Sequence, residues 1–225
     1  MKYTNPYVPP TLTVDAVIFQ LIDNVLNVLL INRLNEPFKG IWALPGGYNA
    51  IGETTIKALE RIVSYKTGVN IIKDLNYIEQ LYTFDTVARD PRGHAVSVTY
   101  MGCGRGVEVK SSMTNVKFFP VNSLPKLAYD HQNIIKYAHQ RLIAKLTYTN
   151  AAFSFLQPKF SLTELQSTYE SIIGRSLDKR NFRKKILSLG LIIETDEMRR
   201  DGAYRPAHLY EFKSKTLESL SRSFD

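Results

Sequence analysis

The chain has 225 residues, of which 44% are hydrophobic and 22% charged, so it is long enough for two globular domains of ordinary composition. Its single cysteine, Cys103, excludes an intramolecular disulfide and a cysteine-rich metal site, and its formal net charge of +8 favours a polyanionic partner. The first residues lack the apolar core of a signal peptide, and no apolar run approaches the length of a membrane helix. We therefore expect a cytoplasmic protein with no membrane partner, no bound metal and no cofactor.

The first part of the chain predicts strands interleaved with two helices. Residues 1–10 carry prolines and no period, so we expect an extended arm. Two aliphatic and β-branched runs follow, and the Asp23–Asn24 pair between them predicts a hairpin, because both residues tolerate turn geometry. Apolar residues spaced by three and four predict one helix that ends at Gly68 and another over Ile134–Leu146. The predicted strands are Leu12–Leu21, Val25–Arg33, Ile41–Leu44, Asn76–Phe84, Ala95–Met101 and Val116–Pro120.

The stretch Leu44–Val69, LPGGYNAIGETTIKALERIVSYKTGV, organises this first part. A glycine pair after a proline predicts a turn, and Gly68 stands where a helix commonly needs a left-handed residue at its end. The apolar face of the helix between them is expected to carry Ile56, Leu59 and Val63. The stretch resembles the Nudix box, a loop–helix–loop with the pattern G-x5-E-x7-R-E-U-x-E-E-x-G-U, where U is aliphatic. The residues in register with that pattern are Gly47, Glu53, Arg61, Val63, Gly68 and Val69.

The three carboxylates that carry the chemistry of the Nudix box are replaced by Ile62, Tyr65 and Lys66. In the working motif, acids at i, i+3 and i+4 share one helix face and hold divalent cations against a pyrophosphate. Ile62 offers no ligand atom, the phenol of Tyr65 loses its proton only near pH ~10, and Lys66 brings positive charge to the place of the metal. The resemblance implies a Nudix fold, an α/β/α sandwich with a mixed sheet, and the substitutions imply that this domain does not hydrolyse.

A second domain is expected where the helical period breaks, in TYTNAAFSFLQPK at residues 147–159. Ser161 and Glu164 form the S-x-x-E pattern of a capping box. The elements predicted after it are a helix ending at Gly174, a helix over Lys179–Leu189 capped by Asp178, and strands at Leu191–Glu194 and His208–Phe212. This order predicts a winged helix-turn-helix domain and an α+β fold overall. The predicted limits are 1–10 for the arm, 11–148 for the Nudix-like domain and 149–225 for the winged-helix domain.

The second helix of the winged-helix domain is strongly basic, with six positive side chains and one acid in residues 175–185. Its core side is expected to carry Phe182, Ile186 and Leu189. At about 100° per residue, Arg180, Arg183 and Lys184 are expected to point away from that core and form a cationic side, as a helix seated in the major groove requires. Asn181 can pair with adenine, and the hairpin can reach the DNA backbone as a wing. The candidate DNA-binding residues are Lys179, Arg180, Asn181, Arg183, Lys184, Arg199, Arg200 and Arg205. Binding of RNA or of protein is the alternative.

Nearly the whole chain resembles the Nudix-related transcriptional regulators, whose best-known branch, NrtR, represses genes of NAD biosynthesis or salvage. The resemblance rests on LTVDAVIF, GIWALPGG, RDPRGHAVSVTY, YDHQNII, FSLTELQSTYE and DKRNFRKKI. It implies a homodimer that senses ADP-ribose or a related metabolite and holds a palindromic operator in double-stranded DNA. Two alternatives stay open: a regulator that senses a sugar such as arabinose, and an active ADP-ribose pyrophosphatase of the Nudix class with an appended nucleic-acid-binding domain.

The expected effector is phosphorylated, because backbone N–H groups of the Gly46–Gly47 turn can approach phosphate oxygens and arginines can make bidentate contacts. Loss of three acids removes repulsion, so Lys66 can help to neutralise a pyrophosphate that binds without metal. Asp130 and His131 open the last helix of the Nudix-like domain and are expected to form a cap rather than to contact the ligand. The candidate ligand-binding residues are Arg33, Gly46, Gly47, Glu53, Arg61, Lys66, Arg89 and Arg92, and no residue is expected to be catalytic.

Overall fold

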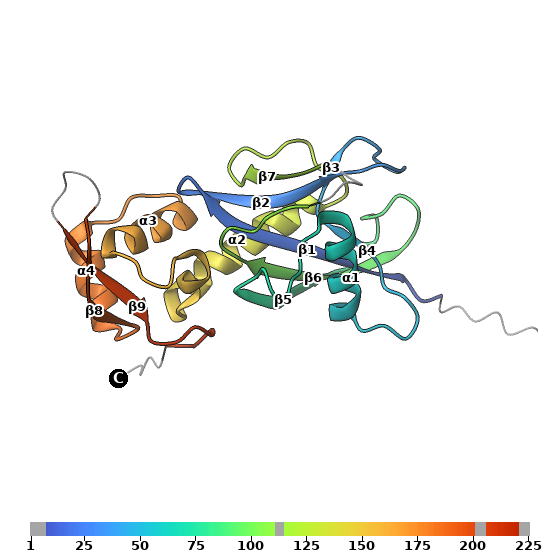
Figure 1. Ribbon diagram of the computed structural model, residues 1–225. Helices are drawn as coiled ribbons and strands as arrows, with labels where there is room; N and C mark the ends of the chain where they lie inside the picture. Colours follow the sequence, from blue (N-terminus) through green and yellow to red (C-terminus); the bar gives the residue numbers. More distant parts are fainter. Residues whose placement is uncertain (1–7, 111–114, 201–205, 221–225) are drawn as a thin grey trace, which may run out of the picture.

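The computed structural model of the protein describes residues 8–110, 115–200 and 206–220 (Figure 1). Its larger part is a seven-stranded sheet formed by β1 Thr11–Ile22, β2 Val25–Asn32, β3 Trp42–Ala43, β4 Gly46–Tyr48, β5 Tyr77–Phe84, β6 Ala95–Cys103 and β7 Val116–Pro120. The strand order is β3-β2-β1-β6-β5, with β4 paired to β1 and β7 paired to β2. β1 runs parallel to β6, and the other pairs in this sheet run antiparallel. The predicted mixed sheet is confirmed.

A two-residue turn joins β1 to β2, with Ile22 opposite Val25. Asp23 and Asn24 have φ angles of 50° and 59°. Two successive left-handed residues are typical of a type I′ turn, whose twist matches that of antiparallel strands, and Asp and Asn accept this conformation more readily than most residues. The predicted hairpin is therefore confirmed.

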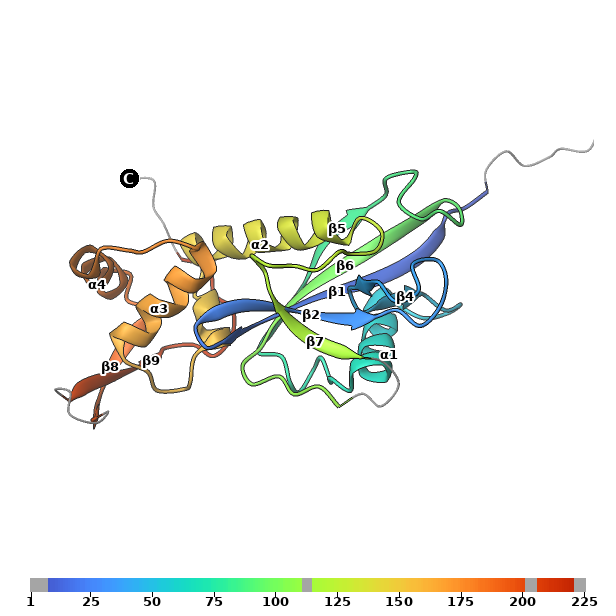
Figure 2. The same cartoon turned by 90° about the horizontal axis from the view of Figure 1, so that it is seen from above.

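Two helices cover opposite faces of the sheet, α1 Thr55–Thr67 and α2 His131–Tyr148 (Figure 2). Successive side chains of a strand point to opposite faces, and the packing along β1 shows this alternation. Ala16 and Ile18 belong to the core under α1, whereas Val17 and Phe19 belong to the core under α2. The predicted α/β/α sandwich is confirmed.

The buried face of α1 is turned slightly from the predicted one. Leu59, Ile62 and Val63 are buried, whereas Ile56 is 39% exposed, so the expectation that Ile56 faces the core is wrong. Ile62 takes its place, because a residue three positions after Leu59 returns to the same face. Gly68 ends α1 with a φ of 74°, and a Cβ there would lie 2.9 Å from the backbone of Lys110. The predicted glycine stop is confirmed, and both its conformation and its neighbour require glycine.

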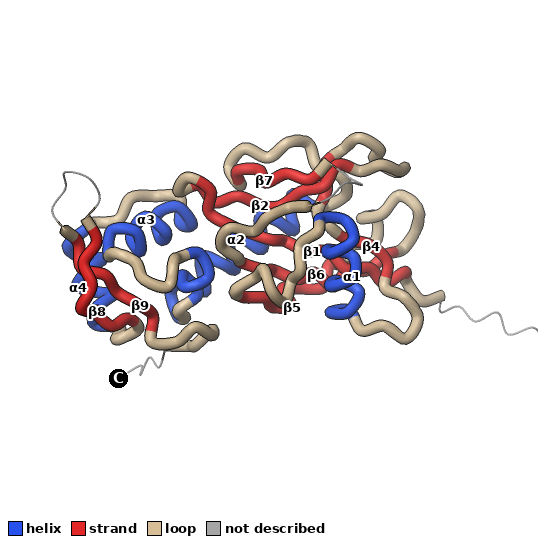
Figure 3. Tube along the Cα trace, viewed as in Figure 1, coloured by secondary structure: helices blue, strands red, loops and turns tan. Residues whose placement is uncertain are grey.

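The smaller part consists of η1 Ala151–Phe155, α3 Leu162–Ile173, α4 Lys179–Ser188 and the two-stranded sheet of β8 Ile192–Arg199 and β9 Ala207–Phe212. Figure 3 shows this hairpin apart from the large sheet, against the group of helices. Ser161 and Glu164 make both hydrogen bonds of the predicted capping box, and the carboxylate of Asp178 accepts the N–H of Asn181 at 2.8 Å. The sequence did not predict η1, and β8 extends to Arg199 instead of ending at Glu194. Its pairing with β9 resumes after an irregularity that the local pattern does not reveal.

One hydrophobic core runs through both parts of the molecule. It joins Leu142 and Leu146 of α2 to Phe155 of η1 and to Leu165 and Ile172 of α3. Residues 147–159, where the second domain is expected to begin, are thus largely packed, and the limits 11–148 and 149–225 stay predictions. Residues 1–7 of the expected arm lie outside the described residues. Within the described part of the chain, no helix is long and apolar enough to span a membrane.

Candidate functional site

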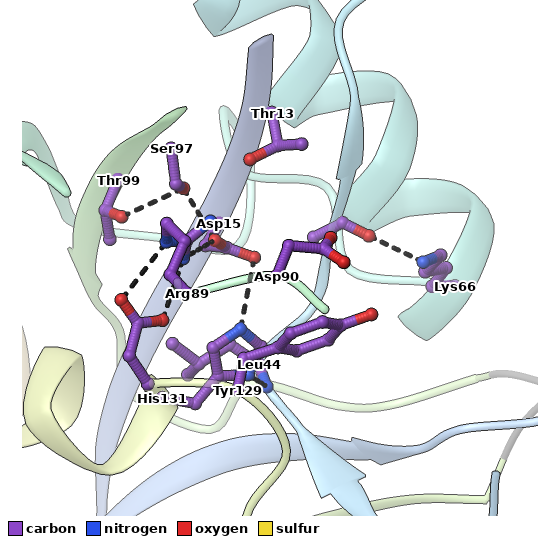
Figure 4. A network of polar contacts seen from close by, with 12 residues as sticks. Thr13, Asp15, Leu44, Lys66, Arg89, Asp90, Ser97, Thr99, Tyr129 and His131 are labelled. Atoms are coloured by element: carbon purple, nitrogen blue, oxygen red, sulfur yellow. Dashed lines mark hydrogen bonds and ion pairs between the residues drawn. The ribbon is translucent and has the colours of Figure 1, made fainter. Parts of the chain in front are cut away.

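A cavity of about 420 Å³ lies between β1, β4, the last turn of α1, the segment 89–92 and the start of α2. These segments are far apart in the sequence and come together around the cavity (Figure 4). Six of the eight candidate ligand-binding residues line this cavity, namely Arg33, Gly46, Gly47, Lys66, Arg89 and Arg92. Glu53 and Arg61 are not among its lining residues. The sequence therefore located part of the lining, while other lining residues, such as Asp15, Tyr48 and Tyr129, were not singled out.

A buried ion-pair network forms the floor of the cavity. Arg89 donates from Nε and Nη2 to the two carboxylate oxygens of Asp130 at 3.1 and 2.9 Å, and its Nη2 lies 3.5 Å from Asp15. The carboxylate of Asp15 also accepts the hydroxyl of Ser97 at 2.6 Å. Burial alone would lower the pKa of Arg89, but the bonds to Asp130 and the charge of Asp15 outweigh it and raise that pKa. Arg89 is therefore a charged but heavily engaged group, shared between β1 and α2.

His131 fixes the position of this network against β1 and the residues between β3 and β4. Its Nδ1 accepts the backbone N–H of Leu44 at 2.9 Å, and its Nε2 lies 3.7 Å from Asp15. Burial lowers the pKa of His131 more than the nearby acids raise it, so the ring is neutral and its proton is on Nε2. The expectation that Asp130 and His131 form a helix cap is wrong. Asp130 occupies the N-cap position without a side-chain cap bond, because its carboxylate is bonded to Arg89.

Tyr129 holds two arginines at the mouth of the cavity. The guanidinium of Arg33 lies 4.9 Å from the centre of its ring, and Nη2 of Arg92 donates to its hydroxyl at 3.3 Å. Arg92 also pairs with Asp90 at 2.6 Å. Tyr129 has a φ of 54°, a strained conformation for an aromatic residue that costs on the order of 1–3 kcal/mol and is found mostly at functional sites. The side chain is thus held in place by the fold rather than by its local preference.

Lys66 reaches from the last turn of α1 into the wall of the cavity. Its ammonium donates to the carbonyl oxygen of Gly46 at 2.6 Å. Burial lowers the pKa of Lys66, the charge of Arg33 lowers it further, and the charge of Asp15 opposes both. An anion beside this ammonium would favour its charged form. Lys66 can therefore bind an anionic ligand at the place where the Nudix box carries a carboxylate.

Gly46 and Gly47 form β4 instead of the predicted turn. Asp15 of β1 pairs with Gly46, and a Cβ on Gly46 would lie 1.9 Å from Oδ1 of Asp15. A Cβ on Gly47 would lie 3.2 Å from Cδ1 of Ile62. The prediction of a turn is wrong, because the pairing depends on a strand that lies elsewhere in the sequence. The missing side chains let the carboxylate of Asp15 and the side chain of Ile62 approach the strand closely, one at each of two successive residues and hence from opposite faces.

Glu53 and Arg61 are bonded to each other outside the cavity. Arg61 donates from Nε and Nη2 to Glu53 at 2.8 and 2.7 Å, and to the carbonyl oxygen of Tyr48 at 3.1 Å. Glu53 also accepts the N–H of Ala50 at 3.0 Å. The bond from Arg61, followed by that from Ala50, lowers the pKa of Glu53 to about 2. The pair therefore closes the loop before α1.

The second feature of the chain is the exposed cationic face of α4. Lys179, Arg180, Asn181 and Lys184 are all exposed. The inward side of the helix is formed by Phe182, Ile186 and Leu189, as predicted. This combination of an exposed positive face and a buried apolar face is typical of a helix that enters the major groove of DNA.

Arg183 is an exception among the candidate DNA-binding residues of α4. It is half-buried, and its Nη2 donates to Oγ1 of Thr163 on α3 at 3.4 Å. The expectation that it points away from the core is wrong. Residues three positions apart differ by about 60° around a helix, so Arg183 stays close to the buried Ile186.

The hairpin arginines differ in their surroundings. Arg199 lies in β8, half-buried, and pairs with Glu164 of the capping box at the start of α3. Arg200 follows β8 and is exposed. Arg205 lies outside the described residues. Within the described residues, Arg200 is therefore the predicted wing residue whose side chain stays exposed.

Comparison with known proteins places both parts of the chain in one family. The family model of the NUDIX domain matches residues 11–139, and that of the NrtR DNA-binding winged helix domain matches residues 152–212. The ADPR responsive transcriptional repressor NtrR of Acinetobacter baylyi is 35% identical over 213 residues, which cover 92% of this chain and 83% of that relative. The chain belongs to the NrtR family. The predicted Nudix-like domain followed by a winged helix is thereby confirmed.

Solved structures of the NrtR family agree with this assignment. Shewanella oneidensis NrtR complexed with a 27mer DNA is 35% identical with a TM-score of 0.75, covering 90% of this chain and 93% of that chain. The NUDIX domain of the same protein complexed with ADP ribose is 37% identical with a TM-score of 0.52, covering 60% and 90%. The ADP-ribose pyrophosphatase of Methanocaldococcus jannaschii is also similar, 41% identical over 139 residues, which cover 60% of this chain and 77% of that relative.

The Nudix box of this NrtR family member does not fit a divalent cation. Ile62 is buried beneath Gly47, Tyr65 is 63% exposed, and Lys66 is bonded to Gly46. Over residues 8–110, 115–200 and 206–220, no three histidine, cysteine or acidic side chains lie where they could share a metal ion. Positions 62, 65 and 66 thus lack the carboxylate oxygens that hold Mg²⁺ against a pyrophosphate.

Asp15 and Tyr129 line the cavity although the sequence reasoning missed them. For Asp15 a signal existed, because a lone acid in the β-branched run LTVDAVIF is rarely buried unless it is paired. For Tyr129 no comparable signal existed. Its position depends on a positive φ angle and on two arginines that approach from other segments.

Proposed function

We propose that the protein is a transcriptional repressor that binds DNA through α4 and the wing, responds to ADP-ribose bound in the cavity, and does not hydrolyse it. The observation that carries this proposal is the exchange at Lys66. There a cation, bonded to Gly46 in the cavity wall, replaces a carboxylate of the Nudix box. The same chain has a winged helix with an exposed cationic face. The Acinetobacter relative is an ADPR responsive repressor, and Shewanella NrtR structures contain DNA and ADP ribose.

The chemistry of the cavity suits a nucleoside diphosphate ester. Arg33, Lys66 and Arg92 line it together and can contact phosphate oxygens, for which guanidinium groups offer bidentate bonds. Tyr48 and Tyr65 line the same cavity and offer aromatic surface for a base or a ribose. Its volume of about 420 Å³ is within the usual range for a small-molecule site, roughly 300–1,000 Å³.

We further propose that the repressor acts as a homodimer on a palindromic operator and controls genes of NAD metabolism. A winged-helix dimer presents two recognition helices to two half-sites, so the symmetry of the protein and that of the operator would match. The accessible residues proposed to contact DNA are Lys179, Arg180, Asn181, Lys184 and Arg200. Arg183 and Arg199 would instead hold α4 and β8 in place, through Thr163 and Glu164 of α3.

Hydrolysis of ADP-ribose is the second candidate function, favoured by the similarity to a pyrophosphatase. It would require metal-holding carboxylates that positions 62, 65 and 66 do not supply. A sugar-responsive regulator is the third candidate. An uncharged pentose makes no use of the positive charge that Arg33, Lys66 and Arg92 bring to the cavity, so the cavity favours a phosphorylated ligand.

A gel-shift experiment with the DNA upstream of the protein's own gene separates these candidates. We expect ADP-ribose to change the bound fraction, and NAD and arabinose to leave it unchanged. ADP-ribose recovered after incubation with the protein and Mg²⁺ or Mn²⁺ should be intact by chromatography. Turnover at ordinary enzyme rates, roughly 1–10³ per second, would contradict the non-hydrolytic role. A response to arabinose alone would overturn the choice of effector.

Arg61→Ala tests whether the Glu53–Arg61 pair holds the loop rather than the ligand. We expect faster cleavage of the loop at residues 48–53 in limited proteolysis, because Arg61 is bonded to Glu53 and to the carbonyl oxygen of Tyr48. We expect the affinity for ADP-ribose in calorimetry to stay within about threefold of wild type. A loss of ADP-ribose affinity beyond about 30-fold, with the loop still resistant to the protease, would show that Arg61 contacts the ligand.

A further inference from the structure

Tyr129 and Asp130, which lead into α2, and His131, its first residue, contact charged side chains at the cavity. Figure 4 shows Tyr129 and His131 near Asp15 and Arg89. The partners are Arg33 and Arg92 for Tyr129, Arg89 for Asp130, and Asp15 for His131. A ligand that binds the cavity's arginines would therefore compete with, or pull on, contacts made by the residues that lead into α2.

The other end of α2 is built into the winged-helix part. Leu142 and Leu146 share a core with Leu165 and Ile172 of α3, and the ring of His139 is hydrogen-bonded to the carbonyl oxygen of Ile172 at 2.6 Å. α2 has 18 residues and is therefore about 27 Å long. Figure 2 shows it running from the large sheet to α3 without a break. A displacement of one end of such a helix is carried to the other, because packed helices move as rigid units.

α3 in turn packs against α4, the helix proposed to bind DNA. The ring of Tyr169 on α3 lies 5.3 Å from that of Phe182 on α4, and Arg183 of α4 bonds to Thr163 of α3. Ile186 of α4 belongs to the same core as the buried residues of α2 and α3. The described contacts thus form an unbroken path from the cavity, through α2 and α3, to the cationic face of α4.

We propose that Tyr129, Asp130 and His131 are positioning residues that convert occupancy of the cavity into a shift of α2, and hence of α4. The bond between Arg89 and Asp130 is the central element. A diphosphate offers anionic oxygens that compete with Asp130 for the Arg89 guanidinium, so binding loosens the attachment of α2 to the floor of the cavity. This proposal rests on the proposed function, since it needs ADP-ribose in the cavity and DNA on α4.

The test is the coupling ratio, defined as the dissociation constant for operator DNA with saturating ADP-ribose divided by that without it. Linkage makes this ratio equal to the effect of DNA on ligand affinity, so both can be measured on the full-length protein. Asp130→Asn weakens the bond to Arg89 without any ligand, so we expect the ligand-free variant to show the DNA affinity that the wild type has with ADP-ribose. We also expect a lower melting temperature, because the buried Arg89 loses a charged partner. The coupling ratio of this variant should fall to within about threefold of one, while ADP-ribose binds as tightly or more tightly.

Tyr129→Phe is the second variant, and it tests the proposed route through α2 if Asp130→Asn does not fold. It keeps the ring beside Arg33, removes the bond from Arg92, and should lower the coupling ratio severalfold. Glu60→Gln is the matched control, an acid-to-amide change in the exposed Lys57–Glu60 ion pair of α1, and should keep the wild-type ratio. If both test variants keep the wild-type ratio, the proposed route through α2 is wrong. If the wild-type ratio is itself one, the proposed function fails instead.

Discussion

Replacing Arg180 and Lys184 together by alanine is expected to lower the affinity for operator DNA by about 100-fold or more. Both side chains are exposed on α4, one helical turn apart, opposite the buried Ile186. A lost base contact costs about 1–3 kcal/mol, and each lost phosphate contact reduces the salt dependence of log K by about 0.9. The double variant should therefore bind weakly and respond less to salt, while its melting temperature stays close to wild type.

The measurement is fluorescence anisotropy with labelled operator DNA at several salt concentrations. The matched control removes the same charge from exposed positions of the Nudix domain, with Lys73→Ala and Lys126→Ala combined. We expect this control to keep nearly all of the affinity. An equal loss in both double variants would mean that net charge alone attracts the DNA. Unchanged binding by the α4 variant would mean that the exposed face of α4 is not the DNA-contacting face.

Lys66→Met is expected to weaken ADP-ribose binding by about 10- to 100-fold, which corresponds to the ~1.5–3 kcal/mol of a hydrogen bond to a charged group. Methionine keeps the length and apolar stem of the side chain but removes the ammonium bonded to Gly46. Isothermal titration calorimetry measures the affinity, and anisotropy checks that DNA binding without ligand is unchanged. The loss should be the same with EDTA and with Mg²⁺, because the site is proposed to work without metal.

The matched control for Lys66→Met is Lys57→Met, on the same helix. Lys57 pairs with Glu60 at 2.8 Å on the exposed side of α1, outside the main cavity. It should leave ADP-ribose binding near wild type. An affinity that survives in Lys66→Met, or wild-type binding that disappears in EDTA, would show that a metal rather than Lys66 neutralises the diphosphate.

The sequence could predict the features that depend on a few neighbouring residues. The stop of α1 at Gly68 needs only a left-handed residue after an apolar period, and the capping box of Ser161 and Glu164 needs only their spacing. The Asp23–Asn24 hairpin is equally local. Because these signals act within one or two turns of chain, their prediction did not require knowledge of the fold.

The cavity could be predicted only in part, because its walls meet through tertiary packing. The sequence shows that Arg89 is an arginine near a loop, but its burial between Asp15 and Asp130 depends on β1 and α2 meeting at one end of the sheet. For the same reason the sequence predicts a turn at Gly46–Gly47, where the structure has strand β4. Its pairing partner, β1, begins more than thirty residues earlier in the chain.

The replacements in the Nudix box have one physical consequence each. Ile62 fills the space beneath Gly47, Lys66 takes a position in the cavity wall, and Tyr65 lines the cavity edge. The loop–helix–loop itself is kept by the glycines, by the Glu53–Arg61 pair and by α1. We infer that the box has changed from a metal site into part of an anion-binding wall, which suits a sensor.

The most direct test of this role is the DNA affinity of the wild-type protein during a titration with ADP-ribose, measured once in EDTA and once in Mg²⁺. We predict that ADP-ribose changes the dissociation constant for the operator by about tenfold or more, that the change is the same in both buffers, and that the ligand is recovered intact. A DNA affinity that does not respond to ADP-ribose, or that responds only in Mg²⁺ while the ligand is consumed, would contradict it.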